Sequence, residues 1–140
     1  MRIKPLHKNF IMPVKSTQAA GAFDIYMPSE GQCTGAAPEL YGLGFAAAAP
    51  PGYAAIILPR SGVGAKFGVE LNNTCGLIDS DYRGEWKAAL RTKSGLHFAW
   101  DAGERILQFM VIPLAHVVLE QVDSLEDTER DNSGFGSSGK

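Results

Sequence analysis

The sequence GLIDSDYRGE, residues 76–85, places two apolar residues just before a polar segment that contains a glycine. Leu77 and Ile78 enter this stretch, and the apolar run WKAAL at 86–90 follows it. Apolar runs on either side of a short polar segment with glycine are typical of a β-hairpin. The stretch therefore predicts two paired strands joined by an acidic turn.

The turn carries two acids, Asp79 and Asp81, one residue apart. On an extended chain such residues point to the same face, so their carboxylates repel each other unless each has its own partner. We expect one acid to be ion-paired, with Arg83 or Arg60, and the other to be free for chemistry. A solvated acidic turn without a chemical role is the alternative, and the residues alone do not separate the two.

Glycine and proline occur at 16 and 8 positions and separate short apolar runs along the whole chain. Such runs, bounded by Gly, Pro, Asn or Asp, predict an all-β barrel or sandwich. The alanine run at 46–49 favours a helix by propensity, but Pro50 and Pro51 follow at once, so a strand and a turn are expected. The predicted strands are 3–6, 23–27, 45–49, 53–58, 68–71, 86–91, 96–100, 106–112 and 116–122.

The length of 140 residues suits one domain with a tail, and it allows a substantial buried core. The last segment, EDTERDNSGFGSSGK at 126–140, is polar and glycine-rich, so it cannot bury enough apolar area to fold alone. We expect a β-barrel domain over 1–125 and a flexible C-terminal arm over 126–140.

The charge balance argues against binding to nucleic acid or to an anionic membrane, because 13 basic and 15 acidic residues give a net charge of −2. There is no signal-like leader and no apolar run of transmembrane length. Cys33 and Cys75 lie far apart, so free thiols in a reducing, cytoplasmic environment are expected. His7, His97 and His116 lack the spacing of zinc ligands.

Three polar sites within the predicted strands are candidates for binding chemistry. Arg60, Ser61 and Gly62 follow the run 53–58 and offer a bidentate cation, a hydroxyl and a small residue, which suits an anion such as phosphate. An ordinary turn with a surface salt bridge is the favoured alternative. Gln108 lies among apolar residues, where a structural hydrogen bond is the more common outcome. Asp24 is likewise more often an ion-paired edge residue than a ligand.

The glycine- and serine-rich end, GFGSSG at 134–139, offers backbone N–H groups and hydroxyls to a phosphate. Its one aromatic residue, Phe135, is able to stack on a base, an interaction worth about 1–3 kcal/mol. It is not a P-loop, because no GK[ST] sequence opening a helix follows. Plain disorder is the simpler interpretation of this segment taken alone.

Taken together, the motifs GAFDIY, PRSG, GLIDSDYRGE, GERILQF and RDNSGFGSSG occur in the order seen in the trimeric dUTP pyrophosphatase (dUTPase) family. The chain resembles that family over nearly its whole length. The resemblance implies an all-β, jelly-roll β-barrel protomer and a homotrimer with three active sites at subunit boundaries. It also implies that the C-terminal arm of one subunit closes over a site built by the other two.

The resemblance assigns roles to residues at the acidic turn. Asp79 resembles the general base, which orients a water for in-line attack on the α-phosphorus of dUTP and gives dUMP and pyrophosphate. Tyr82 resembles the tyrosine that packs on the deoxyribose and leaves no room for a 2′-hydroxyl. The backbone of a hairpin would read the uracil edge, with these residues: Asn73, Gly76, Leu77 and Ile78. Lys87, on the strand that follows, would provide one further contact with the nucleotide.

The phosphates are assigned to the other motifs. Arg60, Ser61, Gly62 and Gln108 resemble phosphate contacts, and Arg130 resembles the partner of the γ-phosphate. In the arm, Phe135 would stack on uracil, and three small residues would donate to phosphate oxygens: Gly136, Ser137 and Ser138. Mg²⁺ is implied as the counterion of the triphosphate, held by the phosphates and waters, with Asp24 reaching it through water only.

The sequence departs from the family pattern at 21–23, at Leu107 and at 131–133. Leu107 replaces a small residue and must be accommodated by local repacking, and an acid at position 131 beside Arg130 would weaken its hold on phosphate. The alternatives are a dCTP deaminase or bifunctional deaminase–dUTPase, and a nucleotide-binding regulatory trimer. The expected role is to keep uracil out of DNA and to supply dUMP for thymidylate synthesis.

Overall fold

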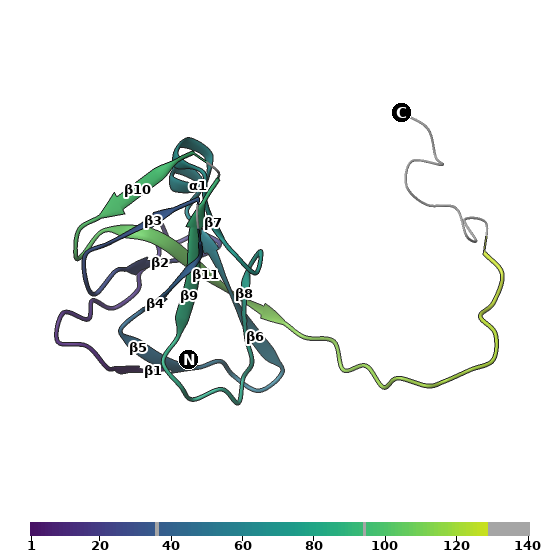
Figure 1. The fold of residues 1–140 in the computed structure, drawn as a ribbon. Coiled ribbons are helices and arrows are strands. Elements are labelled where there is room, and N and C mark those ends of the chain that lie inside the picture. Colours follow the sequence, from purple (N-terminus) through teal and green to yellow (C-terminus); the bar gives the residue numbers. More distant parts are fainter. Residues whose placement is uncertain (36, 94, 129–140) are drawn as a thin grey trace.

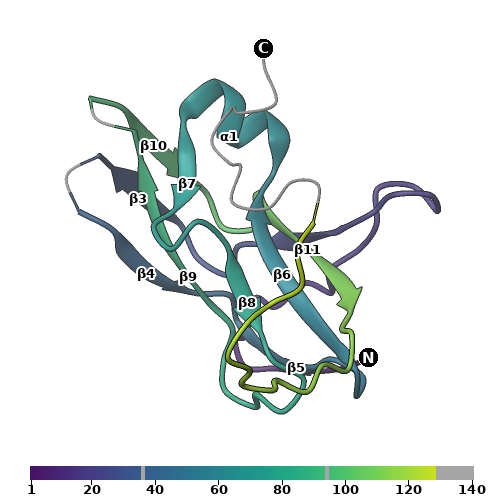
Figure 2. The same cartoon turned by 90° about the vertical axis from the view of Figure 1, so that its right-hand side faces the viewer.

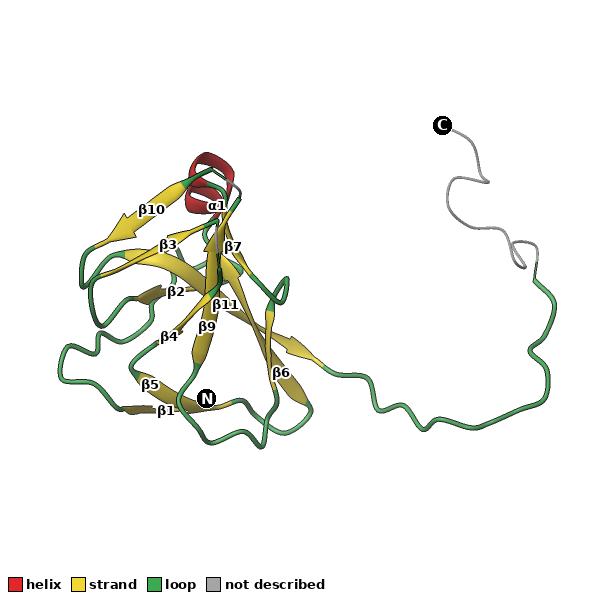
Figure 3. Ribbon diagram, in the orientation of Figure 1, coloured by secondary structure: helices red, strands yellow, loops and turns green. Residues whose placement is uncertain are grey.

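The computed structural model describes residues 1–35, 37–93 and 95–128, and the all-β prediction is confirmed (Figure 1; Figure 3). Strands form a twisted barrel, and one short helix lies at one end of it. The elements are β1 (Arg2–Pro5), β2 (Phe23–Tyr26), β3 (Gly31–Thr34), β4 (Glu39–Gly42), β5 (Phe45–Ala48), β6 (Tyr53–Pro59), α1 (Ser61–Phe67), β7 (Val69–Leu71), β8 (Gly76–Ile78), β9 (Lys87–Thr92), β10 (His97–Trp100) and β11 (Arg105–Pro113).

All strand pairs are antiparallel, and most neighbours in a sheet are distant in sequence. One sheet has the order β2-β11-β6-β8, a second has the order β4-β9-β7, and two further pairs are β1-β5 and β10-β3. Figure 2 shows β6, β8 and β11 side by side on one side of the barrel. This arrangement agrees with the jelly-roll barrel that was expected.

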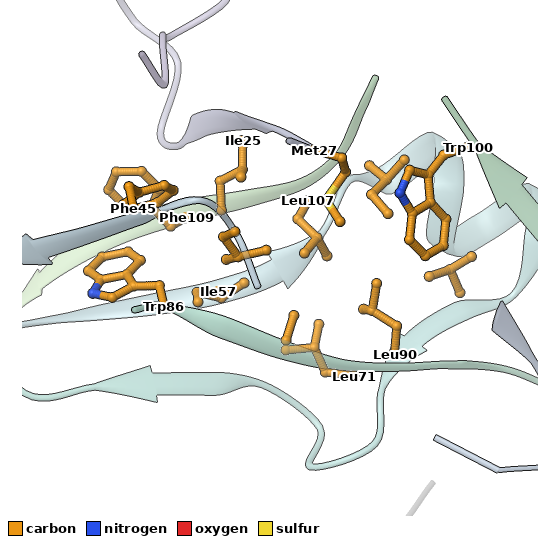
Figure 4. Close-up of a cluster of buried hydrophobic side chains, with 14 of the residues drawn as sticks. Ile25, Met27, Phe45, Ile57, Leu71, Trp86, Leu90, Trp100, Leu107 and Phe109 are labelled. Atoms are coloured by element: carbon orange, nitrogen blue, oxygen red, sulfur yellow. The ribbon is translucent and has the colours of Figure 1, made fainter. Parts of the chain in front are cut away.

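The core between the sheets is built around aromatic residues (Figure 4). Trp86 is 0% exposed, and its ring centroid lies 5.2 Å from those of both Phe45 and Phe109. Its indole N–H donates to the carbonyl oxygen of Ala47 at 3.2 Å. A buried Trp with its N–H satisfied contributes a large apolar area at no cost in unpaired polar groups. Because Trp86 directly follows the acidic stretch 79–85, it anchors one end of that stretch in the core.

Most predicted strands are observed to within one residue at each end, since Gly and Pro mark their limits. The exception is 116–122, where no strand forms. Beyond Pro113 the described chain has no strand or helix and extends away from the barrel (Figure 1). Val118 and Leu119 are 80% and 93% exposed there, so the described residues do not bury this apolar run.

The predicted hairpin at 76–90 is wrong, because its two strands belong to different sheets. β8 pairs with β6, whereas β9 pairs with β4 and β7. The acidic stretch therefore crosses from one sheet to the other. The chain between β7 and β8 forms a tight turn with an isolated bridge between Leu71 and Thr74, although these two strands also belong to different sheets.

The sequence interpretation also missed β3, β4 and the helix α1. The helix sequence SGVGAKF contains two glycines, which disfavour helix by about 1 kcal/mol each. It ends at Gly68, whose φ of 66° is the left-handed conformation common after a helix. None of the helices in the described ranges is long and apolar enough to span a membrane.

Candidate functional site

A buried carboxylate organises one end of the sheet formed by β2, β11 and β6. The Asp24 side chain is 8% exposed and accepts two charged hydrogen bonds. Arg60 Nε lies 3.0 Å from its Oδ1, and Arg105 Nη1 lies 3.1 Å from its Oδ2. The expectation that Asp24 is an ion-paired residue of an edge strand is confirmed, because β2 is the edge of its sheet. Arg105 was not singled out in the sequence.

Arg60 is held by the backbone as well as by Asp24. It follows the last residue of β6, and its N–H donates to the carbonyl oxygen of Ile106 at 3.0 Å. Its Nη1 donates to the carbonyl oxygen of Arg105, also at 3.0 Å. The salt bridge named in the alternative interpretation is therefore present, but its carboxylate partner is buried and not at the surface.

A hollow of about 440 Å³ lies beside this cluster, at the start and along one side of α1. Ser61 and Gly62 are exposed at its edge, and a methyl group added at Gly62 would meet no atom within 4 Å. Lys66 lines the same hollow as Arg60 and was missed in the sequence, because the helix that brings it there was not predicted. Two cations, a hydroxyl and an open glycine suit an anion.

Gln108 lies between the two strands that carry this cluster. In the register of β11 it is opposite Asp24 on one side and Leu58 on the other. Its Nε2 donates to the carbonyl oxygen of Pro59 at 3.1 Å, so the expected structural hydrogen bond is confirmed. The neighbouring Leu107 is 0% exposed and belongs to the core, which accommodates the larger side chain.

The acidic stretch begins at the other end of β6. β8 pairs Ile78 with Ala55 and Gly76 with Ile57. A methyl group at Gly76 would lie 3.2 Å from the Ile57 Cβ, so a larger residue would push the two strands apart. β8 therefore delivers Asp79 to solvent just beyond its last residue, where the side chain is exposed.

The expected ion pair at the turn is wrong. Neither Asp79 nor Asp81 has a salt bridge within the described chain, whose ion pairs involve only Asp24 and Glu70 as acids. Arg60 is engaged by Asp24, and Arg83 Nη1 donates to the carbonyl oxygens of Ser80 and Tyr82, at 2.7 and 3.0 Å. Both acids are exposed.

Tyr82 and Lys87 lie in the region that the resemblance assigns to the nucleoside. The Tyr82 amide donates to the carbonyl oxygen of Asp79 at 3.2 Å, which closes a turn. Its hydroxyl donates to the Glu85 carbonyl oxygen at 3.2 Å, and its ring covers Gly84, where any Cβ would collide with it. Lys87 is exposed on β9.

The segment that the resemblance assigns to uracil recognition is a tight turn between β7 and β8, which pair with different strands. Thr74 has a φ of 71°, and its N–H donates to the carbonyl oxygen of Leu71 at 2.9 Å. The Cys75 N–H donates to the carbonyl oxygen of Asn73 at 2.8 Å. Asn73 is exposed near the tip, and Leu77 is 59% exposed. The uracil-assigned residues therefore lie on one element.

One chain does not bring the two halves of the site together. Asp79 directly follows Ile78, which pairs with Ala55 near the start of β6. Arg60 directly follows Pro59, the last residue of the same strand. At about 3.3 Å per residue, this separates them by roughly 20 Å along the strand. The predicted arm residues Arg130, Phe135, Gly136, Ser137 and Ser138, together with 131–133, lie outside the described residues.

Asp24 is the acid that the resemblance links to Mg²⁺. The described residues contain no group of three or more His, Cys, Asp or Glu side chains able to hold one. Both oxygens of Asp24 already accept from a guanidinium, although a carboxylate oxygen has lone pairs for a second donor such as water. The arrangement fits contact with Mg²⁺ through water and does not fit direct ligation.

These features define an all-β barrel with an arginine–aspartate cluster beside a hollow at one end of β6 and, at the other end, an acid without an ion pair among the described residues. The family model described as dUTPase matches residues 8–139. The chain belongs to the dUTPase family.

Named relatives and solved structures extend this finding. A deoxyuridine 5'-triphosphate nucleotidohydrolase of Nautilia profundicola is 38% identical over 140 residues, covering 100% of this chain and 99% of the relative. A relative of the same name from Dictyoglomus turgidum is 37% identical over 143 residues, with coverage of 98% and 96%.

Two phage structures show the same fold. A mutant dUTPase of Staphylococcus bacteriophage 80alpha, solved with dUpNHpp, has a TM-score of 0.88 at 23% identity, and the match covers 99% of this chain and 98% of that one. A mutant dUTPase from phage phi11 of S. aureus, described with a structural Mg(II) ion, has a TM-score of 0.80 at 18% identity, with coverage of 90% and 98%.

Proposed function

We propose that this protein hydrolyses dUTP to dUMP and pyrophosphate. The observation that carries the proposal is its membership of the dUTPase family over residues 8–139, together with relatives of that activity that match it end to end. The dCTP deaminase alternative is not favoured, because these relatives are named as dUTP nucleotidohydrolases.

Asp79 acts as the general base of this reaction. Its carboxylate is exposed and unpaired within the described chain, so it is able to accept a hydrogen bond from a water and aim that water at the α-phosphorus. Tyr82 packs on the deoxyribose and excludes a 2′-hydroxyl. The segment with Asn73 and Gly76 reads the uracil edge, where thymine's methyl group does not fit.

Arg60, Ser61 and Gly62 hold the phosphates, supported by Gln108. The guanidinium and the hydroxyl face the oxygens on which negative charge grows as pyrophosphate leaves. When bound, Mg²⁺ neutralises charge on the triphosphate. The phi11 structure is described with a structural Mg(II) ion, and in this protein Asp24 would reach the ion on the triphosphate through water.

The active unit is a homotrimer with shared sites. The separation of Asp79 from Arg60 within one chain supports this, because a second copy is needed to place an acid beside the phosphate cluster. The exposed apolar run after β11, which includes Val118 and Leu119, supports it as well, since such residues are stabilised by burial against another copy. The arm at 126–140 then closes over a site and excludes water.

A substrate panel tests the proposal. We expect release of pyrophosphate from dUTP with Mg²⁺, strong loss of turnover with EDTA, and little turnover of dTTP, dCTP or UTP. Release of ammonia from dCTP would instead support a deaminase. Nucleotide binding without any turnover would support the regulatory trimer, and a role in dUMP supply requires the release of dUMP from dUTP.

A further inference from the structure

Strand β11 contains a bulge that changes which way one arginine points. Its register against β2 shifts between Arg105 and Leu107. Ile106 and Leu107 are both buried, at 2% and 0% exposed, although regular alternation would bury only one of them. In a regular strand Arg105 and Gln108, three residues apart, would point to opposite faces. The extra residue reverses this, so Arg105 shares a face with Gln108 and with Asp24 opposite it.

The bulge places a second cation on a carboxylate that already has one. Asp24 Oδ2 accepts from Arg105, and its Oδ1 accepts from Arg60. The Arg105 guanidinium also lies 5.9 Å from the centroid of the Tyr26 ring. A single carboxylate between two guanidiniums leaves the cluster with a net positive charge beside the hollow. Without Arg105, the Asp24–Arg60 pair would be neutral and would attract an anion less.

Arg105 also controls the plane of the Arg60 side chain. Arg60 uses Nε for Asp24 and Nη1 for the Arg105 carbonyl oxygen. Two bonds from adjacent nitrogens fix a planar guanidinium, and the Nη2 donors remain for a ligand in the hollow that Arg60 lines. Arg105, which directly precedes the extra residue Ile106, therefore contacts Arg60 through its backbone and Asp24 through its side chain.

We propose that Arg105 is a positioning residue for phosphate binding, which holds Asp24 and, through it, orients Arg60 toward the nucleotide. This inference rests on the proposed function, since the anion is taken to be the triphosphate of the substrate. It adds a residue that makes no contact with the substrate itself. The alternative is that the two arginines and Asp24 only stabilise the fold and have no effect on nucleotide binding.

The test compares Arg105→Gln and Arg105→Lys with the wild-type protein. We expect Arg105→Gln to lower kcat/KM for dUTP by about tenfold or more, the loss typical of a charged hydrogen bond, mainly through a higher KM. Arg105→Lys keeps the positive charge but lacks the planar guanidinium with its several N–H donors. We therefore expect its kcat/KM to lie between those of Arg105→Gln and the wild type. The inhibition constant of deoxyuridine, which has no phosphate, stays unchanged in both variants.

The matched control is Arg91→Gln, which removes an arginine from an exposed pair with Glu70 at 2.8 Å, in the other sheet and outside the lining of the hollow. This variant keeps wild-type kinetics. Melting temperatures and oligomeric state are measured for every variant, and Arg105→Lys provides the comparison if Arg105→Gln unfolds.

A double-variant cycle separates positioning from direct contact. In an Arg60→Gln background, Arg105→Lys, which keeps the positive charge beside Asp24, adds little further loss, because the planar guanidinium of Arg105 acts through Arg60. Losses that multiply in the double variant, or folded Arg105 variants with wild-type kinetics, would overturn the inference. A wild-type protein that does not hydrolyse dUTP would instead overturn the proposed function, so the two failures are distinguishable.

Discussion

The two ends of strand β6 differ in how their polar groups are satisfied. At its C-terminal end, Asp24, Arg60 and Gln108 are tied to one another or to backbone carbonyls. At the other end, Asp79 and Asp81 are exposed and unpaired in the described chain. A phosphate-binding cluster gains from donors fixed in advance. An acid that must handle a water has to stay free until a second copy and the substrate complete its surroundings.

The largest effect is expected from removing the free acid. Replacing Asp79 with Asn keeps the shape but removes the base, so pyrophosphate release falls by about 10²–10⁴-fold. Nucleotide binding, measured by calorimetry with a non-hydrolysable analogue, remains detectable. The matched variant Asp81→Asn, at an equally exposed acid one residue away, loses far less. Comparable losses at the two positions would mean that the turn acts only through its charge.

Deleting residues 131–140 tests whether the arm completes the site. We expect turnover to fall by about 10²-fold, because the arm orders the substrate and excludes water. Folding is nearly unaffected, since the barrel core lies within residues up to Phe109. Thermal unfolding and steady-state kinetics on the same samples measure the two effects. A truncated protein with full turnover would remove the arm from the mechanism.

A smaller change is expected from Gly76→Ala in the uracil-assigned segment. The new methyl group would lie 3.2 Å from the Ile57 Cβ, so β8 must move away from β6. We expect the free energy of unfolding to fall by about 1–3 kcal/mol and KM for dUTP to rise. Gly62→Ala, where the methyl group meets nothing within 4 Å, serves as the packing control in thermal melts. Equal melting temperatures for the two variants would contradict the close approach of the strands.

The smallest effect concerns the reactivity of a thiol in the barrel core, away from both ends of β6. Burial, with a contribution from Glu39, raises the pKa of the Cys33 thiol to about 11, so that thiol stays protonated and unreactive at pH 8. In a Cys75→Ser variant, an alkylating reagent therefore labels the folded protein very slowly at pH 8 and rapidly in denaturant. Mass spectrometry measures the labelling. Fast labelling of the native variant would show that the core opens readily.

The sequence predicted those parts of the fold that depend on local signals. Proline and glycine limited the strands, so β6, which ends at Pro59, was located closely. The pairing of β8 with β6 was not predictable, because alternation of apolar residues does not reveal which distant strand is the neighbour. The run at 116–122 was misassigned for a related reason. Its apolar residues satisfy a strand pattern, but Val117, Val118 and Leu119 are exposed and no described part of the chain buries them.

Site residues were predictable from the sequence where residue type and motif indicate their role. They were not predictable where the role depends on the position of the residue in the folded chain. Asp79 and Arg60 were found by residue type and motif. Arg105 was missed, because only the bulge in β11 turns its side chain toward Asp24, and strict alternation assigns it to the opposite face. Lys66 was missed because the glycines of α1 concealed a helix.

The claim that two copies share each site is tested most directly by complementation. Asp79→Asn and Arg60→Gln proteins are each purified, unfolded together and refolded as a mixture. A shared site predicts that the mixture hydrolyses dUTP faster than the sum of the two separately refolded variants, because some sites combine an intact Asp79 from one chain with an intact Arg60 from another. Activity equal to that sum, in a mixture shown by mass spectrometry to contain mixed oligomers, would contradict the account.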